Sequence, residues 1–294
     1  MANGEKLTED QHFVPQMYLR GFAEIVGSKK DKAFVWEYDL KMMRQIPKQV
    51  NVKTVCFEKN LYEFWSESGE IVAQNRIENA YGNIEKEANN VIRSIKAKAQ
   101  NKNCLNCQSV LSEYEKSILT IFQTVLQFRD PHTIDSGVDF LLRLHPEMST
   151  RDARNLTLMN LLPLGIDPDW DRNTISRTAL ERCCKMAFRI GYTSDDVIIT
   201  SDRPVIEWPP DKNEKDNRPQ AVAFPLTSRL VLFMYSQEPA GNSTFFELNE
   251  EHIRNIQHNV SLLAREKIFS RYPLNEEQIE IVKEARRKKH ENCY

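Results

Sequence analysis

The sequence predicts an α+β fold that is predominantly α-helical, with a small antiparallel sheet formed mainly by residues 195–248 and a short N-terminal hairpin. Apolar residues recur at helical spacing through most of residues 71–192 and again after residue 249. Short β-branched and aromatic runs, separated by turn residues, occupy residues 195–248. We therefore expect a single domain over residues 1–294, in which a helical block (71–192) packs on the small sheet (195–248) and C-terminal helices follow (249–290).

The first expected element is a short helix in the segment QHFVPQMYLRGF, residues 11–22. Pro15 can occupy the first turn of a helix, where its missing N–H costs nothing, and the helix should end near Gly21. The segment also places His12, Gln16 and Arg20 at four-residue spacing, which stacks polar side chains along one side. A hairpin is expected next, over residues 33–46.

Two long helices are expected in the middle of the chain. The first, of about 25 residues, is predicted by apolar or small residues at alternating four- and three-residue spacing: Ile77, Tyr81, Ile84, Ala88, Val91 and Ile95. The second begins at a capping box formed by Ser112 and Glu115, and Pro131 should stop it. After the strands, Asn249 should cap a helix running to about Phe269, and a charged helix should follow Asn275.

Composition restricts the classes of partner. The formal net charge of -2 gives no global field toward nucleic acid or an anionic membrane, so a polyanion contact must be local, as in the basic runs RSIKAKAQNK and RRKKH. No apolar run reaches the length of a membrane span or a signal peptide, which predicts a cytoplasmic protein with no membrane partner. Six cysteines in a chain of this size are expected to be reduced thiols.

Six motifs occur in an order that resembles the domain of unknown function 4238 family: HFVPQMYLRGF, IEKEANNVI, QFRDP, ITSDRPVI, FPLTSRLVLFM and NIQHNVSLLAREKIFS. The resemblance covers almost the whole chain, and it implies no defined activity. It selects a polar pattern, which consists of His12, Pro15 and Leu19, then Glu85, then Gln127, Arg129 and Pro131, then Ser201, Asp202 and Pro204, and finally Asn259. Where the family usually has an asparagine after the aspartate of the fourth motif, this chain has Arg203.

Arg129 is the most informative of these residues. Its helical position puts it on the apolar side of its helix, where an unpaired guanidinium would cost several kcal/mol, so we expect a carboxylate or a bound anion beside it. Asp202, at the end of an apolar strand, is the natural partner. Two alternatives remain open: Arg129 can snorkel outward at its helix end, and Asp202 can build a turn by bonding its own backbone.

His12 is expected at the N-terminal end of a short helix, where the helix dipole keeps the imidazole neutral. A neutral imidazole can act as a base or a ligand, or it can simply hydrogen-bond across its own turn. Glu85 lies at the flank of its helix's apolar seam, and Asn259 lies beside another apolar stripe; each can contribute to a site or be solvated. No nucleophile motif is present.

The metal requirement is open at this stage. A divalent cation, magnesium or manganese, could use Glu85 and Asp202 with water as its remaining ligands. A structural zinc is disfavoured because the pair Cys104 and Cys107 has no second pair at zinc-site spacing.

Two functions fit these residues. The first is a phosphodiester-cleaving enzyme, a ribonuclease or other nuclease and hence a hydrolase, with a role in bacterial defence. In it His12, Arg129, Glu85 and Asp202 are catalytic, while Gln16, Arg20, Gln127, Ser201 and Asn259 bind substrate. The alternative is a non-catalytic protein- or nucleic-acid-binding module whose polar cluster is a structural ion-pair network; its protein partner or homo-oligomer is unspecified. Burial discriminates, because a network closed to water favours structure.

Overall fold

Strands occur along the whole chain, so the expectation of a predominantly helical fold is wrong. The computed structural model describes residues 6–27, 32–46, 48–161, 174–209, 219–238 and 243–291. It is 46% helical and 23% strand, a mixed α+β protein with four sheets among the described residues. The missed strands are mostly two to four residues long and pair with distant segments, so their local sequence patterns are weak.

The sheet expected over residues 195–248 is present as a five-stranded sheet, but it also includes a strand from before residue 195. Its order is β11 (Ile206–Trp208), β12 (Ala221–Thr227), β13 (Leu230–Tyr235), β9 (Ala187–Tyr192) and β14 (Ser243–Glu247). β9 comes from the end of the expected helical block, and its pairing with β14 is parallel, so the sheet is mixed. The other neighbours pair antiparallel, as expected.

A six-stranded sheet joins the two ends of the chain. Its order is β10 (Thr200–Ser201), β15 (Lys267–Ser270), β3 (Ala33–Asp39) and β2 (Glu24–Ile25), with β4 (Arg44–Gln45) and β5 (Val50–Asn51) also on β3. The expected hairpin at 33–46 is confirmed as β3 and β4. The expected helix from Asn249 to about Phe269 is too long, because α8 ends at Leu263 and Lys267–Ser270 form the strand β15.

Two small pairs complete the strands, β1 (Asp10–His12) with β6 (Phe57–Lys59) and β7 (Phe64–Trp65) with β8 (Ile71–Val72). The α-helices are α1 (Gln16–Leu19), α2 (Arg76–Gln100), α3 (Lys102–Leu105), α4 (Glu113–Phe128), α5 (Pro131–Leu144), α6 (Thr150–Asn160), α7 (Thr174–Lys185), α8 (Glu250–Leu263) and α9 (Glu276–Glu291). Short 3₁₀ turns cover Arg20–Phe22 and Val52–Thr54. The predicted 25-residue helix is confirmed as α2.

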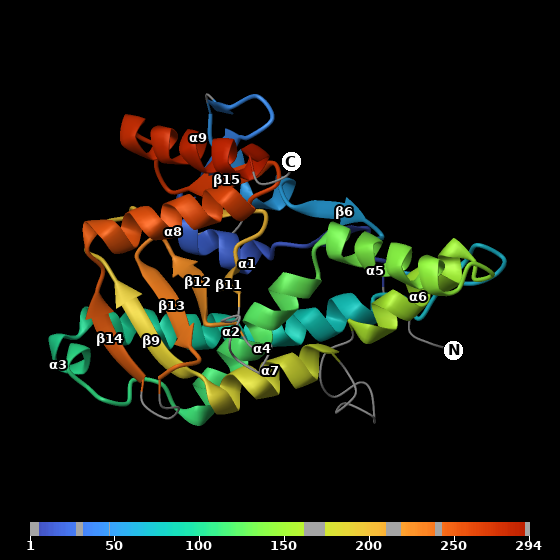
Figure 1. Ribbon diagram of the computed structural model, residues 1–294, viewed down its shortest axis with the longest axis horizontal. Helices are drawn as coiled ribbons and strands as arrows, with labels where there is room; N and C mark the ends of the chain where they lie inside the picture. The colour runs from blue at the N-terminus through green and yellow to red at the C-terminus, as the bar shows by residue number, and fades with distance from the viewer. Residues whose placement is uncertain are drawn as a thin grey trace.

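Helix caps follow the sequence closely at the two ends of α4. The capping box of Ser112 and Glu115 is present at the start of α4. α4 ends at Phe128 with Arg129 as its C-cap, Asp130 is the N-cap of α5, and Pro131 is the first residue of α5. Arg129 and Asp130 therefore occupy the corner between two helices. In Figure 1, α5 and α6 extend from this corner away from the five-stranded sheet, and α8 and α9 lie side by side.

The N-terminal motif is anchored in the main hydrophobic core. Tyr18 stacks on Phe224 of β12, with ring centroids 5.3 Å apart, and its hydroxyl bonds Thr200 of β10 at 2.7 Å. Gly21 packs so closely on β12 that a Cβ there would lie 2.9 Å from the Leu226 carbonyl oxygen. These contacts fix the backbone that carries His12, Gln16 and Arg20.

Two expectations concern the chain as a whole. Cys56, Cys104, Cys107, Cys183 and Cys184 are free thiols, and Cys293 lies outside the described residues. No helix within the described ranges combines the length and the apolar character that a membrane span requires. The single-domain organisation over residues 1–294 and the cytoplasmic location stay predictions.

Candidate functional site

The corner between α4 and α5 separates the polar residues into two clusters. Arg129 points into one of them and Asp130 points into the other. We call them the Arg129 cluster (His12, Tyr62, Tyr81, Glu85 and Arg129) and the Asp130 cluster (Asp130, Asp202, Arg203, Arg265, Arg286 and Lys289).

The Arg129 guanidinium is fully buried, with 0% of its surface exposed. Nη1 donates to Glu85 Oε1 at 2.7 Å, Nε donates to the Tyr62 hydroxyl at 3.3 Å, and Nη2 donates to the His12 carbonyl. The Tyr81 ring lies under the group at 4.5 Å. The predicted inward guanidinium with a carboxylate partner is confirmed, but the partner is Glu85 of α2; the expectation of Asp202 is wrong.

This cluster closes the corner rather than opening a binding surface. The Tyr62 hydroxyl donates to the Arg129 carbonyl at 2.8 Å, so one tyrosine holds both the backbone and the side chain of the α4 C-cap. Burial opposes the charge, but Tyr62 and Glu85 raise the pKa of Arg129, which stays cationic. With three acceptors and an aromatic face already engaged, this guanidinium has little capacity for a further anion.

His12, Gln16 and Arg20 form a chain beside the Arg129 cluster. The Gln16 amide nitrogen lies 3.5 Å from His12 Nε2, and Arg20 Nη2 donates to Gln16 Oε1 at 3.3 Å. His12 Nε2 also lies 3.2 Å from the Lys53 carbonyl, which favours the neutral tautomer that carries its proton there. Burial lowers the pKa of His12, and the charges of Arg129 and Arg20 act in the same direction. The ring is neutral as expected, but the first cause is burial.

Glu78 is a residue of interest that the sequence analysis did not select. It lies on α2 two helical turns before Glu85, on the same side of the helix. Its Oε2 is buried without a hydrogen-bond partner among the described residues. Burial raises the pKa of Glu78 to about 7, although the Arg129 charge opposes that rise. Its position seven residues before Glu85, on the same side of α2, was the sequence feature that could have identified it.

Asp202 and Ser201 organise backbone in the second cluster. Asp202 accepts hydrogen bonds from the backbone N–H groups of Arg265, Glu266 and Lys267, at 2.9, 2.8 and 3.1 Å. It thereby fixes the turn between α8 and β15, and burial raises its pKa despite these bonds. Ser201 Oγ donates to the Arg203 carbonyl at 2.9 Å and accepts from the Arg203 N–H at 3.1 Å. The open alternative, a turn built by local side-chain bonds to the backbone, therefore describes Ser201, whereas Asp202 bonds the backbone of a distant segment.

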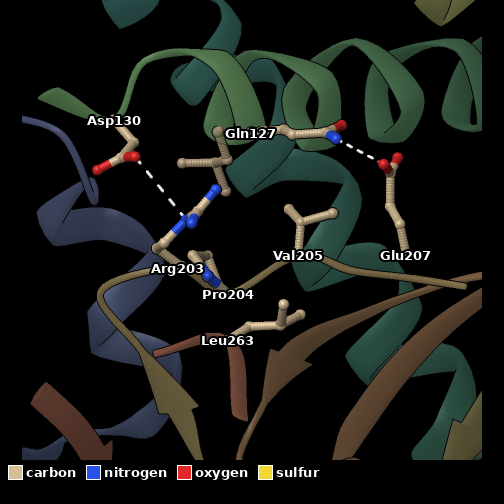
Figure 2. A pocket seen from close by; sticks show the side chains of 8 residues that line it. Gln127, Asp130, Arg203, Pro204, Val205, Glu207 and Leu263 are labelled. Carbon is tan, nitrogen blue, oxygen red and sulfur yellow. Dashed lines mark hydrogen bonds and ion pairs between the residues drawn. The ribbon is translucent and has the colours of Figure 1, made fainter. Parts of the chain in front are cut away.

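Asp130 lies between two cavities. One, of about 140 Å³, is formed where the end of α4 faces the segment from Arg203 to Glu207 (Figure 2). The other, of about 300 Å³, is lined by Phe13, Cys56, Asp202 and Arg265 among others. Burial raises the pKa of the Cys56 thiol well above its usual value, so this thiol is no nucleophile at neutral pH.

Four cations surround the two carboxylates of the Asp130 cluster. Arg203 Nε and Arg265 Nη1 approach Asp130 at 3.8 and 3.5 Å, longer than a good charge-assisted hydrogen bond. Arg286 and Lys289 of α9 both donate to the Ala264 carbonyl at 2.9 Å. Burial lowers the pKa of Lys289, and Arg286, Arg203 and Arg265 lower it further. The cluster therefore holds like charges close together.

Gln127 and Asn259 belong to neither cluster. Gln127 Nε2 donates to Glu207 at 2.6 Å (Figure 2), and its Oε1 accepts from Arg182 at 3.0 Å. Arg182 in turn bonds Glu207, so this set joins α4 to α7 and β11 and forms one wall of the smaller cavity. Asn259 donates to the Asn255 carbonyl of its own helix at 2.8 Å, its one hydrogen bond among the described residues.

The two carboxylates expected to share a divalent cation belong to different networks. Glu85 pairs with Arg129, whereas Asp202 is engaged by three backbone N–H groups. Over the part of the chain that the structure describes, no group of three or more His, Cys, Asp and Glu residues is arranged to hold a metal ion.

The fold and these clusters define a mixed α+β protein with a largely buried ionic network on one side of a helix corner and a charged, hollowed surface on the other. The family model described as "Protein of unknown function (DUF4238)" matches residues 10–272, so the chain belongs to this family. No curated protein and no solved structure matches it.

Proposed function

We propose that the protein binds the phosphodiester backbone of a nucleic acid at the Asp130 cluster. The observation that carries the proposal is the gathering of four cations, Arg203, Arg265, Arg286 and Lys289, around two carboxylates beside two cavities. Glu58, Glu207 and Glu266 also line the two cavities, so the cations lie among several carboxylates. A polyanion would therefore bind through the partly exposed arginine side chains, not through a net positive charge of the whole surface.

The cations keep donors for a ligand. Neither the Arg203 nor the Arg265 guanidinium makes a hydrogen bond to the described residues, and their side chains are 37% and 29% exposed. Burial is the main cause of the lowered pKa of Lys289, and the nearby arginine charges lower that pKa further, so the positive groups repel one another. A bound phosphate would relieve that repulsion and accept from the arginines.

The Arg129 cluster stabilises the helix corner that carries Asp130. It fixes the α4 C-cap, and hence the position of Asp130, through Tyr62 and Glu85. The nearly complete burial of Arg129 agrees with the hypothesis of a structural ion-pair network in a binding module.

The test is an equilibrium titration of fluorescently labelled single-stranded RNA, single-stranded DNA and duplex DNA, followed by anisotropy. We expect Arg203→Gln and Arg265→Gln each to weaken binding several-fold, because each removes one backbone contact. Lys283→Gln is the matched control, because it removes an exposed α9 cation that faces Glu280. Equal affinity for all three variants, or no binding by the wild type at low salt, would refute the proposal.

A second candidate, phosphodiester cleavage by a nuclease, is favoured by Glu78. A carboxyl group with a pKa of about 7 populates both its acid and its base form at neutral pH, as general acid–base catalysis requires, and it lies in the field of Arg129. Incubation with RNA and DNA, with and without magnesium or manganese, should then show cleavage that Glu78→Gln abolishes; cleavage retained by Glu78→Gln would contradict it.

A further inference from the structure

A cavity that is lined by both charged and aromatic side chains lies away from Asp130. It has a volume of about 470 Å³ and forms where the C-terminal half of α2 faces the ends of β9 and β12 and the residue after β15. Its described lining residues include none of those that line the two cavities at Asp130. This volume is in the range of sites for small ligands.

A buried carboxylate organises the charges of this cavity. The Asp196 side chain is 4% exposed, accepts from the Ser228 hydroxyl, and pairs with Arg229 Nη2 at 2.6 Å. Arg271 Nη1 approaches the same carboxylate at 3.5 Å. Burial alone would raise the pKa of Asp196, but the bonds from Arg229 and Ser228 and the Arg271 charge keep it below its usual range. Asp196 is thus ionised and already shared by two arginines.

Arg271 and Lys96 face the cavity with donors to spare. Arg271 Nε is buried and has no hydrogen-bond partner among the described residues, and its one ion pair, to Asp196, is long. Lys96, on the exposed side of α2, has no ion pair within the described ranges. Counting Arg229, three cations line the cavity against two carboxylates, Asp196 and Glu247. A buried unpaired donor beside a cation calls for an anionic acceptor.

Apolar residues of the lining can contact the organic part of a ligand. Tyr192, Leu230 and Ala99 provide aromatic and aliphatic surface, and the hydroxyl-bearing residues Thr193 and Ser194 lie next to Tyr192. A phosphomonoester carries about -1.5 to -2 charges at neutral pH. Its charge can therefore neutralise two separate cations at once, whereas a single carboxylate neutralises one.

We propose that this cavity binds a small organic phosphate, of the size of a sugar phosphate or a nucleoside monophosphate. The phosphate group contacts Arg271 and Lys96, and the organic body packs against Tyr192 and Leu230, which are paired on neighbouring strands. This site does not depend on the nucleic-acid proposal, because the two surfaces use different residues.

The experiment is isothermal titration of the full chain with five probes: AMP, ribose 5-phosphate, inorganic phosphate, adenosine and succinate. We expect one molecule of AMP or ribose 5-phosphate to bind per chain, more tightly than any of the other three probes. Lys96→Gln and Arg271→Gln should each weaken that binding about tenfold. The matched control is Arg93→Gln, which removes an exposed cation one turn earlier on α2, and it should leave the affinity unchanged.

Lys96→Gln changes an exposed side chain, so it keeps the test decisive even if Arg271→Gln lowers the melting temperature. The proposal is overturned if no probe binds at concentrations up to about 10 mM, or if succinate binds more tightly than the phosphates. It is also overturned if inorganic phosphate binds as tightly as AMP and ribose 5-phosphate, or if Lys96→Gln binds like the wild type.

Discussion

Replacing Arg129 with methionine tests the sealed ionic network behind the α4–α5 corner. Methionine fills much of the same volume but leaves Glu85 without its cation, and it removes donors to the Tyr62 hydroxyl and the His12 carbonyl. Breaking one side of a buried pair costs about 3–5 kcal/mol. Because the Glu85 side chain is 23% exposed and recovers some hydration, we expect a loss near the lower value, about 3 kcal/mol.

The assay is urea unfolding followed by circular dichroism. Arg129→Met combined with Glu85→Leu should recover at least about half of the loss, because no unpaired charge is then buried. Arg189→Met is the matched control; its surface pair with Glu238 should be worth under about 1 kcal/mol. The reasoning is refuted if Arg129→Met costs no more than Arg189→Met, or if the double variant is less stable than Arg129→Met alone.

Three further predictions concern protonation and the backbone of the second cluster. Glu78 has a pKa of about 7 in the folded state but near 4.5 in the unfolded chain, so the free energy of unfolding should fall by at most about 3 kcal/mol as the pH rises between these values. Glu78→Gln should flatten this pH dependence in urea unfolding, and an unchanged slope would count against the burial argument. The pKa of His12 is lower in the folded protein than in the unfolded chain, so the unfolded chain binds the proton at a higher pH and stability should fall as the pH drops below about 6.5. His12→Gln should remove this loss from the acid side of a profile of melting temperature against pH. Asp202→Asn loses acceptor capacity for three backbone N–H groups, and a cost of about 2 kcal/mol should appear as faster hydrogen exchange at residues 265–267; unaltered exchange there would show that the carboxylate does not hold this turn.

Helices were predictable here because their signals are local. The apolar spacing from Ile77 to Ile95 and the capping box at Ser112 specify α2 and the start of α4 without reference to the rest of the chain. β15 was not predictable in the same way, because its four residues are a strand only through β3 and β10, which come from distant parts of the sequence.

The same distinction applies to the site. The inward direction of Arg129 follows from its helical angle, but its partner does not, because Glu85 and Asp202 are both distant carboxylates and only the fold shows that backbone N–H groups engage Asp202. Asp130 was not selected because the sequence marks this corner only through Pro131, which was expected to stop the preceding helix. The cations around it come from three separate segments and have no pattern in the linear sequence.

The most direct test of nucleic-acid binding at the Asp130 cluster is the salt dependence of affinity for single-stranded RNA. The slope of log K against log salt concentration falls by about 0.7 for each phosphate contact removed from a single strand. The wild type and Arg203→Gln/Arg265→Gln should therefore differ in slope by about 1.4, while Lys283→Gln keeps the wild-type slope. Equal slopes for the wild type and the double variant would contradict the account.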